Sequence, residues 1–129
     1  MIISLKRFKT SRTSKYGFGG GQKLDTLVDF PLENLDMSPF VLSKKQKSAP
    51  LIYDLFAVSN HFGSVGFGHY TAFGKNPLTD QWMNFDDSSC SPISNSIGKK
   101  EIVSNAAYSL FYRLRGHQNL NDINFEEIE

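Results

Sequence analysis

The stretch from residue 69 to residue 86, HYTAFGKNPLTDQWMNFD, contains two short apolar segments joined by a polar turn. Residues 70–73 and 81–85 are rich in aromatic side chains, which favour β-strands. Residues 76–80 (NPLTD) have the composition of a turn. The pattern predicts a β-hairpin in which the histidine opens one strand and the last aspartate closes the other. Because the two ends of a hairpin lie side by side, we expect these side chains within hydrogen-bonding reach.

Four further segments of the chain carry strand patterns. Apolar side chains recur at every second position in residues 23–30 and 108–114, and residues 2–8 and 51–60 are apolar segments rich in isoleucine or aromatic side chains. Pro39 indicates one short helical turn. About six strands and almost no long helix predict a mainly β domain of the α+β class, built on an antiparallel sheet.

Length, charge and cysteine content narrow the class of protein. The 129 residues fit one domain, which we expect over residues 1–115, followed by an acidic, partly disordered tail over residues 116–129. The 14 Lys and Arg residues balance 13 Asp and Glu residues, so no nucleic-acid or membrane partner is predicted. A single cysteine excludes an internal disulfide, and we expect a cytoplasmic or nuclear protein.

The hairpin ends bring together two members of a nucleophilic triad: the general base, His69, and the residue that orients it, Asp86. A general base needs one tautomer and one orientation, and a carboxylate on Nδ1 of His69 would fix both. Residues 88–90 (SSC) follow Asp86 too closely to reach back across the hairpin, so the nucleophile of such a triad is missing from the pattern. A histidine beside glycines and a pair of aspartates after a strand are also compatible with a plain turn.

No cofactor or metal site is predicted. The glycine-rich segments lack the lysine, the hydroxyl and the glycine spacing of nucleotide-binding loops. Four residues of metal-ligating type lie in this part of the chain, but their spacing matches no established zinc motif: His61, His69, Asp86 and Cys90.

Several separated blocks resemble, in order, the C-terminal part of the catalytic domain of the ubiquitin-specific proteases, which are papain-like cysteine peptidases. The blocks are residues 2–8 (IISLKRF), 53–58 (YDLFAV), 68–73 (GHYTAF), 84–88 (NFDDS) and 107–113 (AYSLFYR). Several blocks in one order are more specific than a single short motif. The resemblance implies that the sheet is the palm of a papain-like domain that is incomplete in this chain.

The resemblance also implies a role for each matching residue. His69 matches the histidine that deprotonates the thiol and later protonates the leaving amine. Asp86 matches the residue that orients this histidine, and Asp87 matches a position that supports the transition state. A further set matches the channel for the ubiquitin tail and its blocking loop: His61, Phe62, Gly63, Gly66, Phe67, Gly68 and Tyr70.

The activity that the resemblance implies is deubiquitination, the thiol-dependent hydrolysis of the bond after the C-terminal glycine of ubiquitin, with ubiquitin and ubiquitinated proteins as partners. The family's nucleophile lies in an N-terminal block followed by a helix, which Cys90 does not match. We therefore expect a missing N-terminal half of the catalytic domain to supply it, and no peptidase activity from this chain alone. The alternatives are a ubiquitin-binding module or inactive fragment, and a structural domain of another family.

Overall fold

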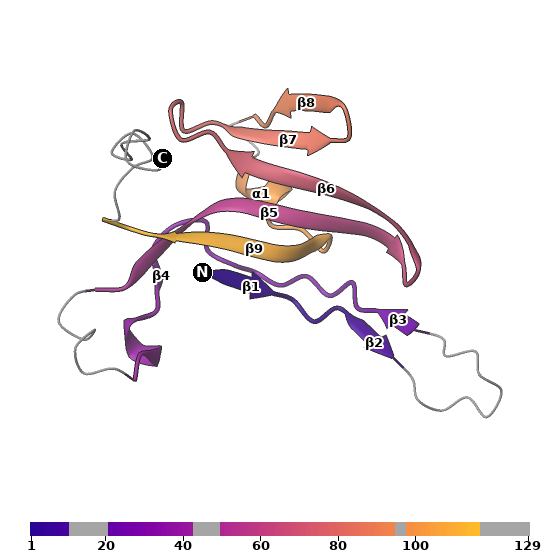
Figure 1. The fold of residues 1–129 in the computed structure, drawn as a ribbon, viewed down its shortest axis with the longest axis horizontal. Coiled ribbons are helices and arrows are strands. Elements are labelled where there is room, and N and C mark those ends of the chain that lie inside the picture. Colours follow the sequence, from indigo (N-terminus) through magenta and orange to yellow (C-terminus); the bar gives the residue numbers. More distant parts are fainter. Residues whose placement is uncertain (11–20, 43–49, 95–97, 117–129) are drawn as a thin grey trace, which may run out of the picture.

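A computed structural model describes residues 1–10, 21–42, 50–94 and 98–116, and its main feature is one antiparallel sheet. Neighbouring strands follow the order β1-β9-β5-β6-β7-β8, and β4 pairs with β5 outside this path (Figure 1). The bounds are β1 Ile2–Ser4, β4 Leu35–Asp36, β5 Ile52–Ser64, β6 Phe67–Lys75, β7 Trp82–Asp86, β8 Ser89–Pro92 and β9 Ala107–Leu114. This architecture confirms the predicted mainly β, antiparallel fold.

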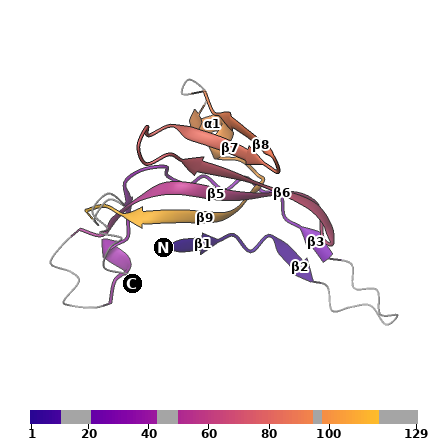
Figure 2. The ribbon, with the colours of Figure 1, turned by 45° about the horizontal axis from the view of Figure 1, so that its top comes forward.

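A separate two-stranded ribbon lies at one end of the sheet. It pairs β2 (Phe8–Thr10) with β3 (Gly21–Lys23) and extends from the end where β5 turns into β6 (Figures 1 and 2). The predicted strand over residues 2–8 is therefore divided between the sheet and the ribbon. The ribbon contacts the β5–β6 turn, because a Cβ added at Gly21 would lie 2.8 Å from Val65 Cγ1.

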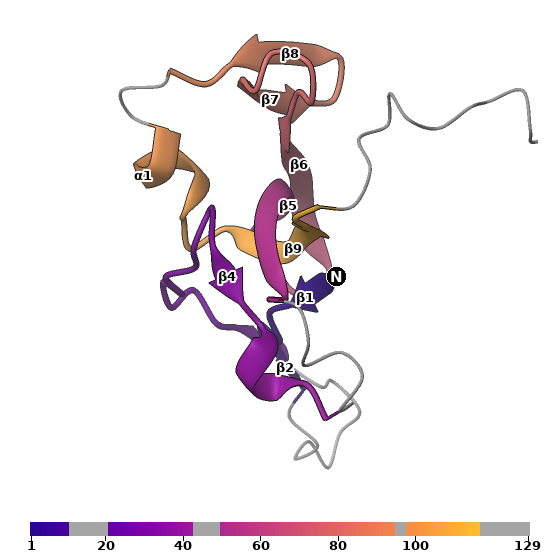
Figure 3. The same ribbon diagram turned by 90° about the vertical axis from the view of Figure 1, so that its left-hand side faces the viewer.

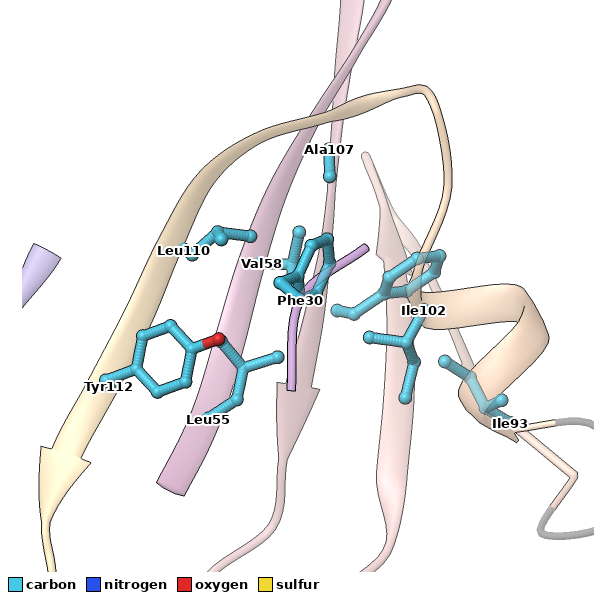
Figure 4. Packing of buried hydrophobic residues seen from close by; sticks show 9 residues of the cluster. Phe30, Leu55, Val58, Ile93, Ile102, Ala107, Leu110 and Tyr112 are labelled. Atoms are coloured by element: carbon cyan, nitrogen blue, oxygen red, sulfur yellow. The ribbon is translucent and has the colours of Figure 1, made fainter. Parts of the chain in front are cut away.

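The hydrophobic core lies on the face of the sheet that the short helix α1 (Gly98–Ile102) covers (Figure 3). Figure 4 shows the buried side chains gathered between the strands, the segment around Phe30 and this helix. The helix contributes Ile102, which is fully buried. The cluster consists of Phe30, Leu55, Val58, Phe73, Ile93, Ile102, Ala107, Leu110 and Tyr112.

The buried guanidinium of Arg7 explains why the strand predicted over residues 23–30 is wrong. Arg7 Nε donates to the Ala107 carbonyl at 2.6 Å, and Nη1 donates to the Leu24 and Thr26 carbonyls at 2.8 Å each. The Leu24 and Thr26 carbonyls thus accept from a side chain, and no strand of the structure includes residues 24–30. β3 ends at Lys23, and the chain beyond it reaches the core as an extended segment that buries Phe30.

Other differences concern short elements. The predicted helical turn is confirmed as a 3-10 helix, η1, at Ser38–Phe40, with Pro39 in its first turn. β8 and the start of α1 lie within residues 88–98, for which the sequence predicted no strand or helix. Neither helix in the described ranges has the length and apolar character that crossing a membrane requires. The predicted tail lies outside the described residues from position 117 onward, so its boundary stays a prediction.

Candidate functional site

The pairing of β6 with β7 places the predicted base and carboxylate on one face of the sheet. Phe73 pairs with Asn84 and Ala72 with Phe85, so one more step along the ladder brings Asp86 opposite Thr71. Because side chains alternate along a strand, residues 69, 71 and 73 share the face of residues 84 and 86. The hairpin predicted from the sequence is thereby confirmed, and Asp86 is the diagonal neighbour of His69.

The two side chains meet in a short hydrogen bond. His69 Nε2 and Asp86 Oδ1 are 2.6 Å apart, and each side chain is about half exposed (48% and 49%). The expectation that the carboxylate binds Nδ1 is wrong. The distal ring nitrogen, Nε2, reaches this diagonal partner on the next strand. Nδ1, the nitrogen nearer the backbone, is therefore the atom that can exchange a proton with a substrate or nucleophile.

The carboxylates around His69 shift its proton affinity. The hydrogen bond that His69 donates to Asp86 raises the pKa of His69 above its ordinary value of 6.5; desolvation opposes it, and the charges of Asp86 and Asp87 raise the pKa further. A histidine with a raised pKa is a stronger base. The pair can therefore take a proton from a thiol and hold it as an imidazolium.

Asp87 follows the pair directly in a left-handed backbone conformation, with φ at 47°. This region is uncommon for residues other than glycine, and aspartate tolerates it better than most. One potential ligand atom from each of His69, Asp86 and Asp87 lies within 4.8 Å of the others, and all three residues are exposed. They are a donor set that a divalent cation could use, but exposed acidic groups commonly occur without an ion, and the prediction of no cofactor stays a prediction.

A cavity of about 420 Å³ adjoins the pair on the same face. Besides His69 and Asp86, its walls are formed by Phe62, Thr71, Phe73, Asn84 and Glu101. Sequence reasoning missed three of these polar residues, Thr71, Asn84 and Glu101. Asn84 stands two positions before Asp86, so strand alternation could have identified it. Glu101 belongs to a five-residue helix that has no visible sequence pattern.

The glycine segment before His69 forms the closed end of a hairpin, in place of the predicted loop. The β5–β6 ladder continues to the pair Ser64 and Phe67, which leaves only residues 65 and 66 as the turn. Gly63 and Gly66 have positive φ values of 94° and 87°, and a Cβ at Gly63 would lie 2.6 Å from the Phe67 carbonyl oxygen. Glycine at position 63 therefore lets the two strands approach closely.

The predicted channel residues divide into two groups. Six of the seven are exposed around the hairpin end, and the Phe67 side chain is the most open of them at 85%. His61 alone is buried, at 4%, and it pairs with Tyr70 on the face opposite to His69. The roles of these seven residues in binding ubiquitin stay predictions.

The single cysteine lies on the wrong face to serve as a nucleophile for His69. Cys90 on β8 pairs with Phe85, and both therefore lie on the face opposite to Asp86. The thiol is exposed. This placement agrees with the expectation that the nucleophile comes from another segment.

The sequence itself matches a known family over almost all of the described residues. Residues 1–112 match the family model described as ubiquitin carboxyl-terminal hydrolase. The chain belongs to the ubiquitin carboxyl-terminal hydrolase family. Within this family it is 49% identical over 113 residues to ubiquitin carboxyl-terminal hydrolase 15 of Homo sapiens and 46% identical over 115 residues to ubiquitin carboxyl-terminal hydrolase 4 of Mus musculus. These matches cover 88% and 89% of the chain but only 10% and 11% of the relatives.

Solved structures of the family share the fold. The Ubp8-Sgf11-Sgf73-Sus1 SAGA DUB module matches with a TM-score of 0.68 and 34% identity over 89% of this chain. The module bound to ubiquitin aldehyde matches with a TM-score of 0.69 and 34% identity over 88% of this chain. In both, the match covers 24% of the solved chain. The chain thus spans about a tenth of the length of these curated relatives and about a quarter of these solved chains.

Proposed function

We propose that this chain supplies the general base, His69, and its orienting carboxylate, Asp86, for hydrolysis of the bond after the C-terminal glycine of ubiquitin. The observation that carries the proposal is the 2.6 Å hydrogen bond between Nε2 and Oδ1 beside an open cavity. The names of the relatives and the ubiquitin aldehyde bound to the SAGA DUB module support ubiquitin as the substrate.

The nucleophile in this proposal is a cysteine thiol from the N-terminal half of the catalytic domain, which is a partner of this chain. His69 Nδ1 takes the thiol proton, and the thiolate attacks the carbonyl carbon of the terminal glycine of ubiquitin. The imidazolium then protonates the leaving amine, which gives an acyl-enzyme. Water, deprotonated by the same nitrogen, attacks the thioester carbonyl, and the thiol regains its proton as ubiquitin leaves with a free carboxylate.

The exposed apolar side chains beside the pair support a binding role for the same region. Phe62, Phe67 and Tyr70 expose 47%, 85% and 54% of their surface around the hairpin end that precedes His69. Gly63, Gly66 and Gly68 of the same segment are also exposed. We assign this surface to the extended tail of ubiquitin, or of ubiquitin on a modified protein. A reducing cytoplasmic or nuclear location agrees with the exposed thiol of Cys90.

A chimera tests the proposal directly. Residues 1–116 of this chain replace the corresponding segment of human ubiquitin carboxyl-terminal hydrolase 15, and release of a fluorophore from the C-terminus of ubiquitin is measured. We expect hydrolysis that is lost on His69→Ala. A folded chimera that is inactive while the parent is active would contradict the proposal.

The 129-residue chain alone distinguishes catalysis from simple binding. We expect it to leave ubiquitin conjugates intact, because its single cysteine lies on the face opposite to His69. Titration with labelled ubiquitin then measures its affinity. A dissociation constant tighter than about 100 µM, roughly −5.5 kcal/mol, would favour a ubiquitin-binding module over an inert fragment.

A further inference from the structure

His61 lies beneath the proposed base, on the reverse face of the sheet. Its backbone N–H donates to the Ala106 carbonyl at 2.8 Å, and its own carbonyl accepts a hydrogen bond from Lys23 Nζ at 2.7 Å. β5 is thus held at this residue by the side chain of Lys23 from β3 and by the residue before β9. The side chain of His61 therefore starts from a backbone position that two neighbouring segments fix.

Three aromatic rings enclose the imidazole of His61. The ring centroids of Phe8, Tyr70 and Tyr108 lie 5.2, 4.8 and 6.4 Å from that of His61. The first two are edge or T-shaped contacts, the arrangement that aromatic rings prefer. Nδ1 of His61 is buried and has no hydrogen-bond partner among the described residues. The ring therefore acts through its shape and packing.

The ring presses directly on the residue before the base. A Cβ added at Gly68 would lie 2.1 Å from His61 Nε2 and 2.7 Å from the Phe62 carbonyl oxygen. Gly68 is thus in close contact with the imidazole of His61 and with the backbone of β5 at Phe62. Phe62 pairs with His69 in the same ladder. The contact between His61 and Gly68 therefore also bears on the position of the His69 backbone relative to the reverse face.

We infer that His61 is a positioning residue, whose ring supports the Gly68–His69 backbone so that the imidazole of His69 meets the carboxylate of Asp86. The neutral form of His61 suits this role. Burial lowers its pKa from the ordinary 6.5, the charge of Lys23 lowers it further, and Asp25 opposes them. The inference rests on the proposed role of His69 as a base and extends it to a residue on the reverse face of the sheet.

The test reads the His69–Asp86 pair in the 129-residue chain by NMR titration of the imidazole Cε1–H signals. The chain has three histidines, and His69→Ala assigns the signal. His61→Gln keeps an amide atom near the position of Nε2, whereas His61→Asn is one methylene shorter and His61→Ala removes the contact. We expect the raised pKa of His69 to be retained in His61→Gln and to fall towards 6.5 in the other two. Asp86→Asn marks the value without the pair.

Two results would overturn the inference. One is a folded His61→Asn or His61→Ala chain whose His69 pKa equals that of the wild type. The other is a His61→Gln chain in which the pKa falls as far as in His61→Ala. If the shorter variants lose their dispersed amide spectrum, Gly68→Ala displaces the same backbone from the other partner of the contact. It is then expected to lower the His69 pKa, and an unchanged value would equally reject the inference. An inactive chimera would leave this titration interpretable, because the readout requires no hydrolysis.

Discussion

Two ionic contacts at opposite ends of the sheet differ in the chemistry they allow. At the start of β5, Asp54 accepts two hydrogen bonds from Arg115, from Nη2 at 2.6 Å and Nε at 2.8 Å, and Arg115 also binds the Asn34 side chain at 2.8 Å. At the other end, His69 makes one 2.6 Å bond to Asp86. The first contact uses two planar groups in a bidentate fit. The second leaves one ring nitrogen uncommitted.

The difference separates a contact that joins strands from a contact that can carry a proton. Guanidinium stays charged at any physiological pH, so the Arg115 contact holds the start of β5 and the end of β9 together across the physiological pH range. Imidazole changes charge near neutral pH. Its one hydrogen bond to Asp86 orients the ring and leaves the other ring nitrogen able to exchange a proton. Both pairs are partly exposed, and their shortest N–O distances are equal. Only the geometry distinguishes them: Arg115 binds its carboxylate with two nitrogen atoms, whereas His69 binds its carboxylate with one.

The largest expected effect comes from removing the base. In the chimera with ubiquitin carboxyl-terminal hydrolase 15, His69→Ala should lower kcat by roughly 10²–10⁴-fold, because general acid–base catalysis is lost, while the melting temperature stays near that of the parent. Arg115→Ala is the matched control at the other end of the sheet. It should lower the melting temperature and leave kcat unchanged. Equal losses of kcat in the two variants would remove the distinction between the contacts.

Gly68→Ala should be the most destabilising small substitution near the site. The added methyl meets His61 and a backbone carbonyl, and such overpacking costs roughly 1–3 kcal/mol of unfolding free energy. Gly98→Ala, where a Cβ meets nothing within 4 Å, is the control and should be neutral or slightly stabilising. Urea denaturation measures both. In the double variant with His61→Ala we expect less destabilisation than the sum of the single effects.

The two contacts should respond to pH in opposite directions. The raised pKa of His69 means that its pairing with Asp86 stabilises the fold fully below pH 6.5 and ceases to do so as pH rises through the raised value. The hydrogen bond from Arg115 lowers the pKa of Asp54, so that contact stabilises the fold above pH 3.8 and is lost as pH falls through the lowered value.

Urea midpoints across the acid and neutral range measure these windows. The difference between wild type and Asp86→Asn should shrink with rising pH, and the difference between wild type and Asp54→Asn should shrink at the acid end. Asp29→Asn, at an exposed position, provides the baseline. A loss of both differences at the same end of the range would show that the contacts do not titrate as assigned.

The smallest expected effect is at the cysteine. Cys90→Ser should change neither stability nor the activity of the chimera, because the thiol is exposed on the face opposite to His69. Mass spectrometry of the 129-residue chain after incubation with a ubiquitin probe carrying a thiol-reactive C-terminus should find no adduct. Stoichiometric labelling of Cys90 by the probe, but not by the same reactive group without ubiquitin, would contradict the assignment.

Local patterns predicted the elements whose side chains pack regularly. The hairpin of β6 and β7, the strand β9 and the turn at Pro39 follow from alternation and turn composition. Alternation was misleading at residues 23–30, since it cannot reveal that Arg7 captures the Leu24 and Thr26 carbonyls from the start of the chain. β8 and α1 are four and five residues long, too short to produce a period.

The chemistry of the site was easier to predict than its geometry. His69 and Asp86 were identified from the two ends of one hairpin, and the family resemblance gave their roles. The choice of Nε2 over Nδ1 depends on the diagonal register, which composition does not contain. The burial of His61 depends on Phe8 and Tyr108, which are far from it in sequence.

The turn between β5 and β6 has two residues, at positions 65 and 66. The face on which His69 lies therefore depends on whether the number of residues in this hairpin is odd or even. Each strand residue faces the side opposite to its neighbour, so deleting or inserting one residue in this hairpin would exchange the faces of every residue in β6 relative to β5. His69 would then lie among the aromatic rings, and Gly68 on the side of the cavity. Length changes of two residues keep the parity. Natural variation in this turn is therefore expected to proceed in even steps.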